Sequence, residues 1–476
     1  MLGIGLGTLM ATIDSSIVNI SLPTLVKIFH TNFATIQWVV LSYTLMLTSL
    51  MLGVGRLGDI LGKKKLYNIG LVIFTIGSLL CGMSPSVEWL IGFRALQGLG
   101  AAMTAALGTA IITEVFPSSE RGRALGISGS IVSIGIALGP PVGGMLIGLV
   151  GWRFIFLVNV PIGIIATFVV ARVVPIFPPH KTGERFDYTG AFITLATLIC
   201  YALGMTLWQA QGLHSTTALI LLVAGGFGLV IFTLAETHNK HPMVDLTMFR
   251  NVLFSINLIM AFLVFIVLAA NFITPFYLEL VKGYSTEQVG LFMMVFPVCM
   301  GSVAPIAGAL SDRYGSRLIS LAGLLFIVAG CCSISTLKSD TNVWGIVLRL
   351  IPLGLGMGIF QSPNNSAVMG TAPPERLGVA SGLLALTRTL GQTTGLPLMG
   401  ALFTATLIKT GNLAAGVDIT NVPPTALVEG VTGIYQTAAV IILAAIALAT
   451  LALWIDNRAK NKVSMEISFP EPQGHI

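Results

Sequence analysis

The sequence predicts an all-α polytopic membrane protein with two similar six-helix bundles and two inserted helices, fourteen transmembrane helices in total. Three observations support this fold class: a composition poor in charge, a series of long apolar segments and an internal repeat. Of the 476 residues, 55% are hydrophobic and only 9% are charged, whereas about a quarter of the residues of a soluble protein are charged. Because such a chain cannot cover a surface that faces water, its solvent must be lipid.

Fourteen segments are long and apolar enough to cross a bilayer as helices. A spanning helix needs about 20 consecutive, mainly apolar residues. The segments run over about 3–25, 35–55, 66–84, 87–113, 124–148, 153–174, 188–209, 217–236, 252–280, 286–310, 318–336, 342–370, 377–406 and 431–455. The first segment lacks the positive leader and the cleavage site of a secretory signal, so we interpret it as a retained helix.

Basic residues between these segments predict the orientation of the chain. Sixteen Lys and Arg residues lie in the loops and the C-terminal tail on one side, whereas the loops on the other side hold five. Because cytoplasmic loops carry the excess of Lys and Arg, we expect both termini in the cytoplasm and the chain in the cytoplasmic (inner) membrane. The net charge of +6 reflects this asymmetry, and it does not indicate a nucleic-acid partner.

The chain also repeats itself at a nearly constant offset. Recurring pairs include Thr35 and Thr286, Gly55 and Gly308, Asp59 and Asp312, Arg94 and Arg349, and Gly139 and Gly395. This repeat predicts two halves of the same orientation, residues 1–174 and 250–455. Residues 175–249 then form a linker with two additional helices, and residues 456–476 form a cytoplasmic tail. A parallel repeat of this kind is typical of transporters whose site lies between two rocking halves.

A glycine-rich, basic motif joins the second and third predicted helices. It reads Gly55-Arg-Leu-Gly-Asp59-Ile-Leu-Gly62-Lys63-Lys64-Lys65, and its second copy contains Asp312, Arg313, Gly315 and Arg317. Glycine permits a tight turn, and Asp59 is expected where the third helix begins, so that it can cap this helix and pair with a cation. We interpret these residues as an ion-paired inner gate. A topology signal with a stable turn is the alternative.

Four charged residues lie well inside predicted helices: Asp14, Arg94, Arg349 and Arg388. Asp14 belongs to the first helix, and Arg94 opens the stretch Arg94-Ala-Leu-Gln97 in the fourth. Charges inside a membrane are costly and are candidate functional sites. The rise per residue of a helix puts Asp14 and Arg94 at depths that a long arginine side chain can bridge. We expect an ion pair that exists only while Asp14 is deprotonated, or alternatively a permanent structural ion pair.

The fifth predicted helix is rich in glycine and proline. Its sequence is Gly135-x-x-x-Gly139-Pro140-Pro141-Val142-Gly143-Gly144. This spacing favours a bendable helix with a flat face for a neighbouring helix. Ordinary packing of small residues is the alternative interpretation.

Together these motifs resemble those of the major facilitator superfamily, and more narrowly of its fourteen-helix drug:proton antiporter family. The resemblance covers nearly the whole chain. It includes the loop motif, the first-helix stretch from Asp14 to Pro23, the Arg94 stretch and the glycine-rich fifth helix, which is similar to the antiporter motif. The resemblance implies the major facilitator fold and export in exchange for protons.

Further polar residues inside the spans are candidates for a substrate cavity. They are Asn19, Tyr43, Gln97, Gln361, Asn364 and Arg388, and each could instead form hydrogen bonds between helices. The one acid well inside the spans is Asp14, which favours neutral, zwitterionic or singly charged substrates. On the first helix Ser15, Ser16 and Asn19 share one face and Asp14 lies nearly opposite. The sequence leaves open which of these faces lines the cavity.

We therefore predict a transporter rather than an enzyme: a proton-driven exporter of small amphipathic compounds that works by alternating access. Its expected partners are the substrate, protons and the lipid bilayer, and it is expected to act as a monomer. No cofactor or metal is expected beyond the proton gradient, and a periplasmic adaptor stays unassigned. A dedicated exporter or exchanger of a metabolite, lipid or peptide is the second interpretation. A non-transporting membrane receptor is the third.

Overall fold

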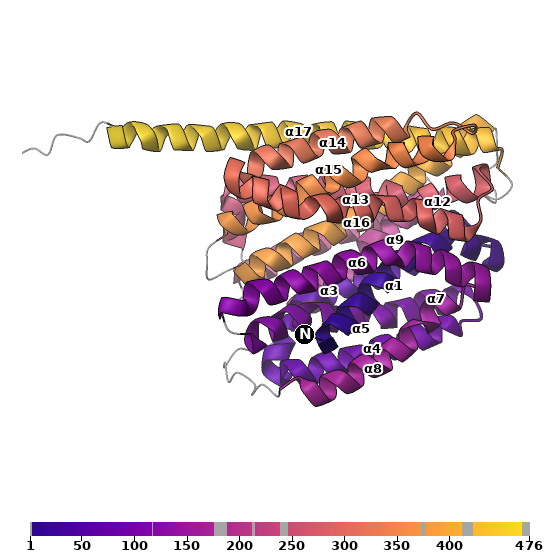
Figure 1. Cartoon of the computed structure of the whole chain (residues 1–476), viewed down its shortest axis with the longest axis horizontal. Coiled ribbons are helices and arrows are strands. Elements are labelled where there is room, and N and C mark those ends of the chain that lie inside the picture. Colours follow the sequence, from indigo (N-terminus) through magenta and orange to yellow (C-terminus); the bar gives the residue numbers. More distant parts are fainter. Residues whose placement is uncertain are drawn as a thin grey trace, which may run out of the picture.

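The computed structural model describes residues 2–116, 118–175, 188–211, 215–238, 246–372, 377–411 and 422–468. Within these ranges the regular secondary structure is helical, without a strand. The long helices lie side by side along one direction (Figure 1). A helix satisfies its own backbone hydrogen bonds, which is what the apolar interior of a bilayer requires. The chain is thus an all-α, multi-pass membrane protein, as predicted.

The first half is a bundle of six spanning helices. They are α1 (Leu2–Phe29), α3 (Trp38–Leu61), α4 (Lys63–Gly82), α5 (Val87–Val115), α6 (Ser118–Val150) and α8 (Asn159–Val173). Two single-turn helices, α2 (Phe33–Ile36) and α7 (Phe154–Leu157), precede α3 and α8. The Asn32 side chain caps α2 by accepting a hydrogen bond from the backbone N–H of Thr35 at 2.8 Å, which fixes the turn between α1 and α3.

Two inserted helices and a second bundle complete the molecule. The inserted helices are α9 (Tyr188–Gln211) and α10 (Thr216–His238), which pack on each other. After the 3-10 turn η1 (Leu246–Arg250), the second bundle contains α11 (Val252–Leu268), α13 (Thr286–Tyr314), α14 (Ser316–Ile334), α15 (Val343–Thr371), α16 (Leu377–Gly411) and α17 (Pro424–Ser468). Among the described helices, thirteen are long and apolar enough to cross a membrane. The remaining predicted span, 377–406, lies within α16.

The ninth span departs from the single helix predicted over 252–280. After α11 the chain forms a 3-10 turn, η2 (Ala269–Phe272), then α12 (Thr274–Phe276) and a π-helical turn, η3 (Tyr277–Val281). Pro275 lies in α12, and proline lacks the N–H that a regular helix would use. The last helix also differs from its prediction. It continues to Ser468 instead of ending near residue 455, and its last part projects beyond the other helices (Figure 1).

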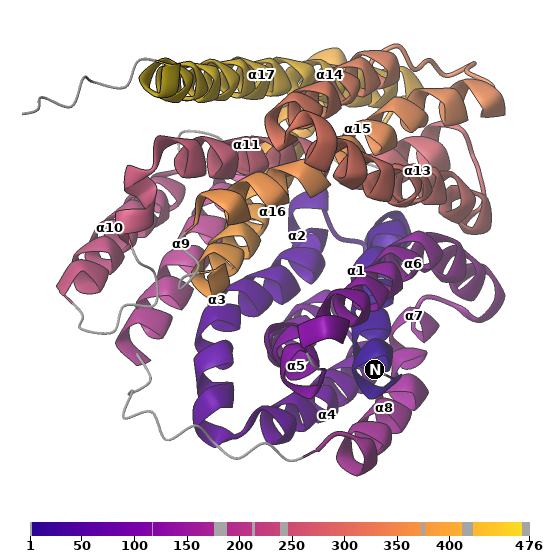
Figure 2. The same cartoon turned by 60° about the vertical axis from the view of Figure 1, so that its left-hand side comes forward.

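The internal repeat is visible in how the two glycine-rich helices pack. In the first half α6 lies between α1 of its own bundle and α13 of the other, and the views in Figures 1 and 2 agree on this arrangement. In the second half α16 packs on α11 and also contacts α3. Each of these helices therefore contacts both bundles.

The two halves are joined most clearly at one end of the molecule. We call the end that holds the turns at Gly62 and Gly315 the motif end, and the opposite end the far end. At the far end Lys27 Nζ of α1 donates to Glu279 Oε1 of η3 at 2.6 Å. Phe33 packs its ring against Phe276 and Phe403, at centroid distances of 5.1 and 5.8 Å. This layer of contacts closes the far end between the bundles.

We expect that breaking the ion pair at the far end weakens this closure. The Lys27 side chain is 43% exposed and that of Glu279 11%, and ion pairs of this partly exposed kind contribute about 0.2–1 kcal/mol. Lys27→Gln and Glu279→Gln should therefore shift the equilibrium towards open far ends by a few-fold. Distances between spin labels at the outer ends of α1 and α13 measure this shift.

The matched control is Lys282→Gln, since Lys282 donates to the Ser339 carbonyl oxygen within its own half. If the Lys27→Gln/Glu279→Gln double variant shifted the distances by the sum of the two single changes, the two residues would act independently. That result would contradict a closing ion pair.

Candidate functional site

A buried ion pair occupies the centre of the first half. Arg94 Nη1 of α5 lies 2.7 Å from Asp14 Oδ2 of α1, and the two side chains are 1% and 0% exposed. The same Nη1 also donates to Gln97 Oε1 at 2.6 Å, and Arg94 Nε donates to the Val39 carbonyl oxygen at 2.8 Å. The contact between Asp14 and Arg94, predicted from their depths in the sequence, is confirmed.

Two amide groups complete the hydrogen bonding of the carboxylate. Asp14 Oδ1 accepts from Gln97 Nε2 and from Asn159 Nδ2, each at 2.8 Å. Gln97 Nε2 also donates to Ser78 Oγ of α4 at 2.8 Å. Three helices, α4, α5 and α8, thus supply side chains to the cluster around the carboxylate of α1, and α3 supplies the carbonyl oxygen that binds Arg94. The carboxylate oxygens of Asp14 therefore both have hydrogen-bond partners inside the bundle, as a buried polar group requires.

Aromatic rings cover the arginine. The guanidinium carbon of Arg94 lies 4.2 Å from the centroid of the Tyr43 ring and 5.8 Å from that of Phe156. Cation–π contacts of this kind stabilise a desolvated cation. If Asp14 bound a proton, Arg94 would lose its counter-charge and three donors would point at a neutral acid.

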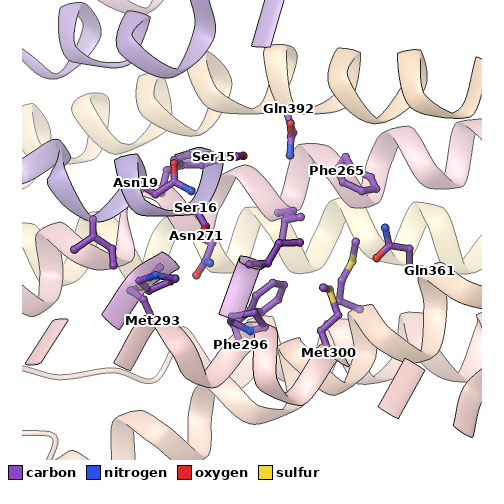
Figure 3. Close-up of a pocket in the computed structure, with 17 residues that line it drawn as sticks. Ser15, Ser16, Asn19, Phe265, Asn271, Met293, Phe296, Met300, Gln361 and Gln392 are labelled. Atoms are coloured by element: carbon purple, nitrogen blue, oxygen red, sulfur yellow. The ribbon is translucent and has the colours of Figure 1, made fainter. Parts of the chain in front are cut away.

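A cavity of about 220 Å³ lies between the halves, on the motif-end side of the closed layer. Figure 3 shows its labelled side chains, which come from α1 of the first half and from η2, α11, α13, α15 and α16 of the second. The lining residues are Ser15, Ser16, Asn19, Ile20, Ile136, Pro140, Phe265, Leu268, Asn271, Phe272, Met293, Phe296, Pro297, Met300, Met357, Gln361 and Gln392. No residue in this lining is charged.

The structure answers which face of the first helix lines the cavity. Ser15, Ser16 and Asn19 belong to the lining, whereas Asp14 points into its own bundle and is fully buried. One helix thus presents a polar face to the cavity and a carboxylate to the core behind it. Successive side chains of a helix point in directions about 100° apart. Asp14 and Ser15 can therefore be neighbours in the sequence and still lie in the bundle core and at the cavity, respectively.

The other cavity candidates divide into two groups. Gln361 lines the cavity together with Asn19. Tyr43 and Gln97 are not in this lining and belong to the Asp14 cluster, which is the alternative of contacts between helices. Asn364 is 1% exposed and also outside the lining.

Arg388 of α16 is not a lining residue either. Its Nη2 donates to Asn365 Oδ1 at 2.6 Å, and its guanidinium lies 5.6 Å from the Phe265 ring centroid. Phe265 itself does line the cavity, so Arg388 stands one residue behind the wall. Its hydrogen bond to Asn365 connects α16 to α15.

The glycines of α6 form two rows with different neighbours. A Cβ at Gly135, Gly139 or Gly143 would overlap Thr12, Ser16 or Ile17 of α1. A Cβ at Gly144 would overlap the Thr286 carbonyl oxygen of α13, in the other half. Pro140 approaches α13 as well, since a Cβ on Gly290 would overlap its carbonyl oxygen. The predicted flat face is thus two faces, one for each bundle.

Both copies of the loop motif turn at a glycine with positive φ, 92° at Gly62 and 89° at Gly315, a conformation that glycine adopts without strain. The backbone of Asp59 lies inside α3, because α3 ends at Leu61 and α4 begins at Lys63. The prediction that Asp59 stands at the start of the following helix is therefore wrong. The side chain of Asp59 lies outside the described residues, and Gly55 is described only as part of α3.

Cations of the two motif copies pair within their own halves. Lys63 Nζ lies 2.8 Å from Glu114 Oε2 of α5, and Lys64 lies in the first turn of α4. In the second copy Arg317 pairs with Asp456 of α17. Asp456 is the first residue of the segment that we predicted as the cytoplasmic tail. Arg313 stacks over the neighbouring Tyr314 ring at 5.3 Å, and Asp312 is exposed in the last turn of α13.

Several functional residues were not predicted from the sequence. Asn159 and Ser78 bind within the Asp14 cluster, and Asn271 and Gln392 line the cavity. Asn159 stands in the stretch Trp152 to Pro161, but an asparagine at the start of a helix usually indicates a cap. Only the packing of α8 on α1 reveals its contact with Asp14.

The comparisons with known proteins agree with this architecture. The family model described as "Major Facilitator Superfamily" matches residues 4–396. This protein belongs to the major facilitator superfamily. Among solved structures, this superfamily member is similar to a bacterial homologue of the human lysosomal transporter Spinster. The TM-score is 0.66, with 17% identity and 95% of each chain covered.

Curated relatives of this major facilitator protein are transporters of several kinds. It is 37% identical to the riboflavin transporter RibZ of Clostridioides difficile, over 84% of this chain and 87% of the relative. It is 32% identical to the multidrug resistance protein Stp of Mycobacterium tuberculosis, over 86% and 76%. It is 29% identical to the tetracenomycin C resistance and export protein of Streptomyces glaucescens, over 84% and 75%. The protein is therefore a transporter and not an enzyme.

Proposed function

We propose that this protein exports small amphipathic compounds across the cytoplasmic membrane in exchange for protons. The excess of basic residues at the motif end supports a cytoplasmic location for that end and for both termini. With that orientation the contacts at the far end lie on the outer side of the cavity, which suits an exporter that takes up its cargo from the cytoplasm.

The observation that carries the proposal is the double role of α1. Ser15, Ser16 and Asn19 line the cavity, and Asp14, on the face of α1 that is buried in the bundle core, binds Arg94. A rotation or tilt of α1 that accompanies cargo binding changes the surroundings of the carboxylate. Conversely, a proton on Asp14 removes the ion pair that holds α1 to α5. Cargo and proton thus bias the same helix, which is the requirement for coupling.

The rest of the machinery follows from the contacts between bundles. The glycine rows of α6 allow α1 and α13 to slide against it, and the loop motifs at Gly62 and Gly315 act as the inner gate when the motif end closes. The energy comes from the proton gradient without a further cofactor, and one chain contains every part, so a monomer suffices. No periplasmic adaptor is assigned.

A second candidate function is the dedicated transport of one metabolite. The 37% identity to a riboflavin transporter favours it, as does a cavity lined by amides, thioethers and rings without a charged side chain. Multidrug pumps for cations would gain from a carboxylate in the cavity. The relatives named for multidrug resistance and for tetracenomycin export favour the broader export function.

The proposal is tested in inside-out vesicles that contain a pH-sensitive dye. Addition of a transported compound should release protons from acidified vesicles containing the wild-type protein, and the Asp14→Asn variant should release none. A panel of riboflavin and uncharged aromatic drugs separates the two candidate functions, because a dedicated transporter responds to one compound and an exporter of amphiphiles to several. Uphill transport that is indifferent to the proton gradient would contradict proton exchange.

A further inference from the structure

Four carboxamide side chains surround the cavity between the halves. Asn19 comes from α1, Asn271 from η2, Gln361 from α15 and Gln392 from α16, and Figure 3 shows them around the same space. They come from both halves of the molecule and lie on four separate elements. A cavity of this size with amides on several sides has the character of a built polar site within an otherwise apolar interior.

The protein itself leaves much of this hydrogen-bonding capacity unused. Asn19 Oδ1 is buried without a hydrogen-bond partner. In the described part of the chain, the side chains of Gln361 and Gln392 form no hydrogen bond to another residue. A buried polar atom without a partner costs about 1–3 kcal/mol, which applies to Asn19 Oδ1. The half-buried amides of Gln361 and Gln392 are available to a ligand beside it.

The remaining lining selects the body of that ligand. Phe265, Phe272 and Phe296 provide rings, and Met293, Met300 and Met357 provide polarisable thioethers. Aromatic and sulfur contacts suit a flat conjugated ring system. Because the lining contains no charged residue, an ionic ligand would enter without a counter-charge, which is costly in an apolar site.

A carboxamide presents an acceptor beside a donor. The complementary group on a ligand has the same pair in the opposite order, as in the –CO–NH– edge of a lactam or an imide. We infer that the cavity recognises uncharged, flat heteroaromatic compounds with a lactam or imide edge, and that Asn19 and Gln361 determine this specificity. This inference rests on the proposed transport function, because it treats the cavity as the substrate site.

The distribution of the amides gives the recognition a mechanical consequence. Asn19 belongs to the first half, whereas Asn271, Gln361 and Gln392 belong to the second. A ligand that bonds to both sets ties the halves together across the cavity. A compound without the –CO–NH– edge fills the cavity but leaves the amides unpaired. Such a compound therefore stabilises the approach of the two halves less than a lactam does.

Equilibrium binding to the purified full-length protein tests the inference with three compounds of one ring skeleton. Phenanthridinone is a flat three-ring lactam. Benzochromenone is its lactone, in which a ring oxygen replaces the N–H, and ethidium is a flat cation on the same skeleton. We expect the wild-type protein to bind the lactam at least about tenfold more tightly than the lactone, because a site built for an N–H leaves its acceptor unpaired when the N–H is missing. Ethidium should bind more weakly than the lactam.

Variants then assign the preference to residues. Asn19→Leu and Gln361→Met keep the approximate side-chain volume and should remove most of the preference for the lactam while binding of the lactone changes little. The control is Asn257→Leu, a buried amide of α11 outside the cavity, which should keep the full preference. The comparison of lactam with lactone on the wild-type protein needs no variant, so a folding defect cannot obscure the result.

Equal affinity of the wild-type protein for lactam and lactone would overturn the inference, as would tighter binding of ethidium. Retention of the preference in both cavity variants would overturn the assignment to Asn19 and Gln361. These measurements use no proton gradient, so they are independent of the energy source. A preserved lactam preference combined with gradient-insensitive transport would contradict the proposed proton exchange alone.

Discussion

We expect the Asp14→Asn variant to lose all proton-driven uphill transport. Asparagine has nearly the same shape but carries no charge and binds no proton in this range, so the step that separates the two states of α1 disappears. Transport of a fluorescent compound into inside-out vesicles, with and without a pH gradient, measures the loss. Energy-independent exchange of cargo across the membrane should remain, because the cavity residues are intact.

Stability needs its own control for this variant. The substitution leaves Arg94 buried without its counter-charge, and removal of one partner from a buried ion pair typically costs about 3–5 kcal/mol. The double variant Asp14→Asn/Arg94→Gln removes both charges and should recover much of the thermal stability without recovering uphill transport. Asp14→Glu keeps a carboxylate and should retain part of the coupling. Full uphill transport in the stable double variant would contradict the assignment of Asp14 as the proton carrier.

The second large effect is expected from Gly144→Val. A Cβ at this position would overlap the Thr286 carbonyl oxygen and come within 3.0 Å of Glu287 Cα, and backbone atoms cannot move aside as a side-chain tip can. Overpacking of this kind costs about 1–3 kcal/mol. Because the overlap is with the other half, the strain is relieved by opening the far end. Transport should fall strongly while the first bundle stays folded.

Labelling of single cysteines placed at the outer ends of α1 and α13 measures this opening. The matched control is Gly129→Val on the same helix, where a Cβ would meet nothing within 4 Å, and it should transport normally. Gly139→Val gives a useful contrast, since its overlap is with Ser16 inside the same half. An unchanged labelling pattern in Gly144→Val would show that α6 and α13 do not separate during transport.

Much of the fold follows from the sequence because lipid imposes simple rules. A long apolar segment must become a helix. Motifs that recur at a nearly constant offset of about 250 residues predict two equivalent bundles. The partnership of Asp14 with Arg94 was also predictable, since two opposite charges at similar depth have few alternatives in a membrane. The irregular ninth span was not, because Pro275 permits either a kinked helix or a broken one.

The assignment of side chains to the cavity could not be predicted with the same success. α1 is apolar nearly all round, so its sequence pattern does not distinguish a face towards the cavity from a face towards the bundle. Tyr43 and Gln97 are polar and deep, as a cavity residue should be, yet they bind the Asp14–Arg94 pair. Which of several buried polar groups find one another depends on the packing of five helices, and no local pattern in the sequence records that packing.

The separation of Asp14 from the cavity wall has a consequence for pharmacology. If the cavity is the cargo site, as we propose, a compound that blocks it competes with cargo without touching the carboxylate or its arginine. Substitutions at Asn19 or Gln361 could therefore confer resistance to such an inhibitor at little cost to energy coupling. An inhibitor could instead immobilise α1 through its contacts with α6. At that surface larger residues cannot replace the glycines of α6, so substitutions that confer resistance to such an inhibitor should be rare.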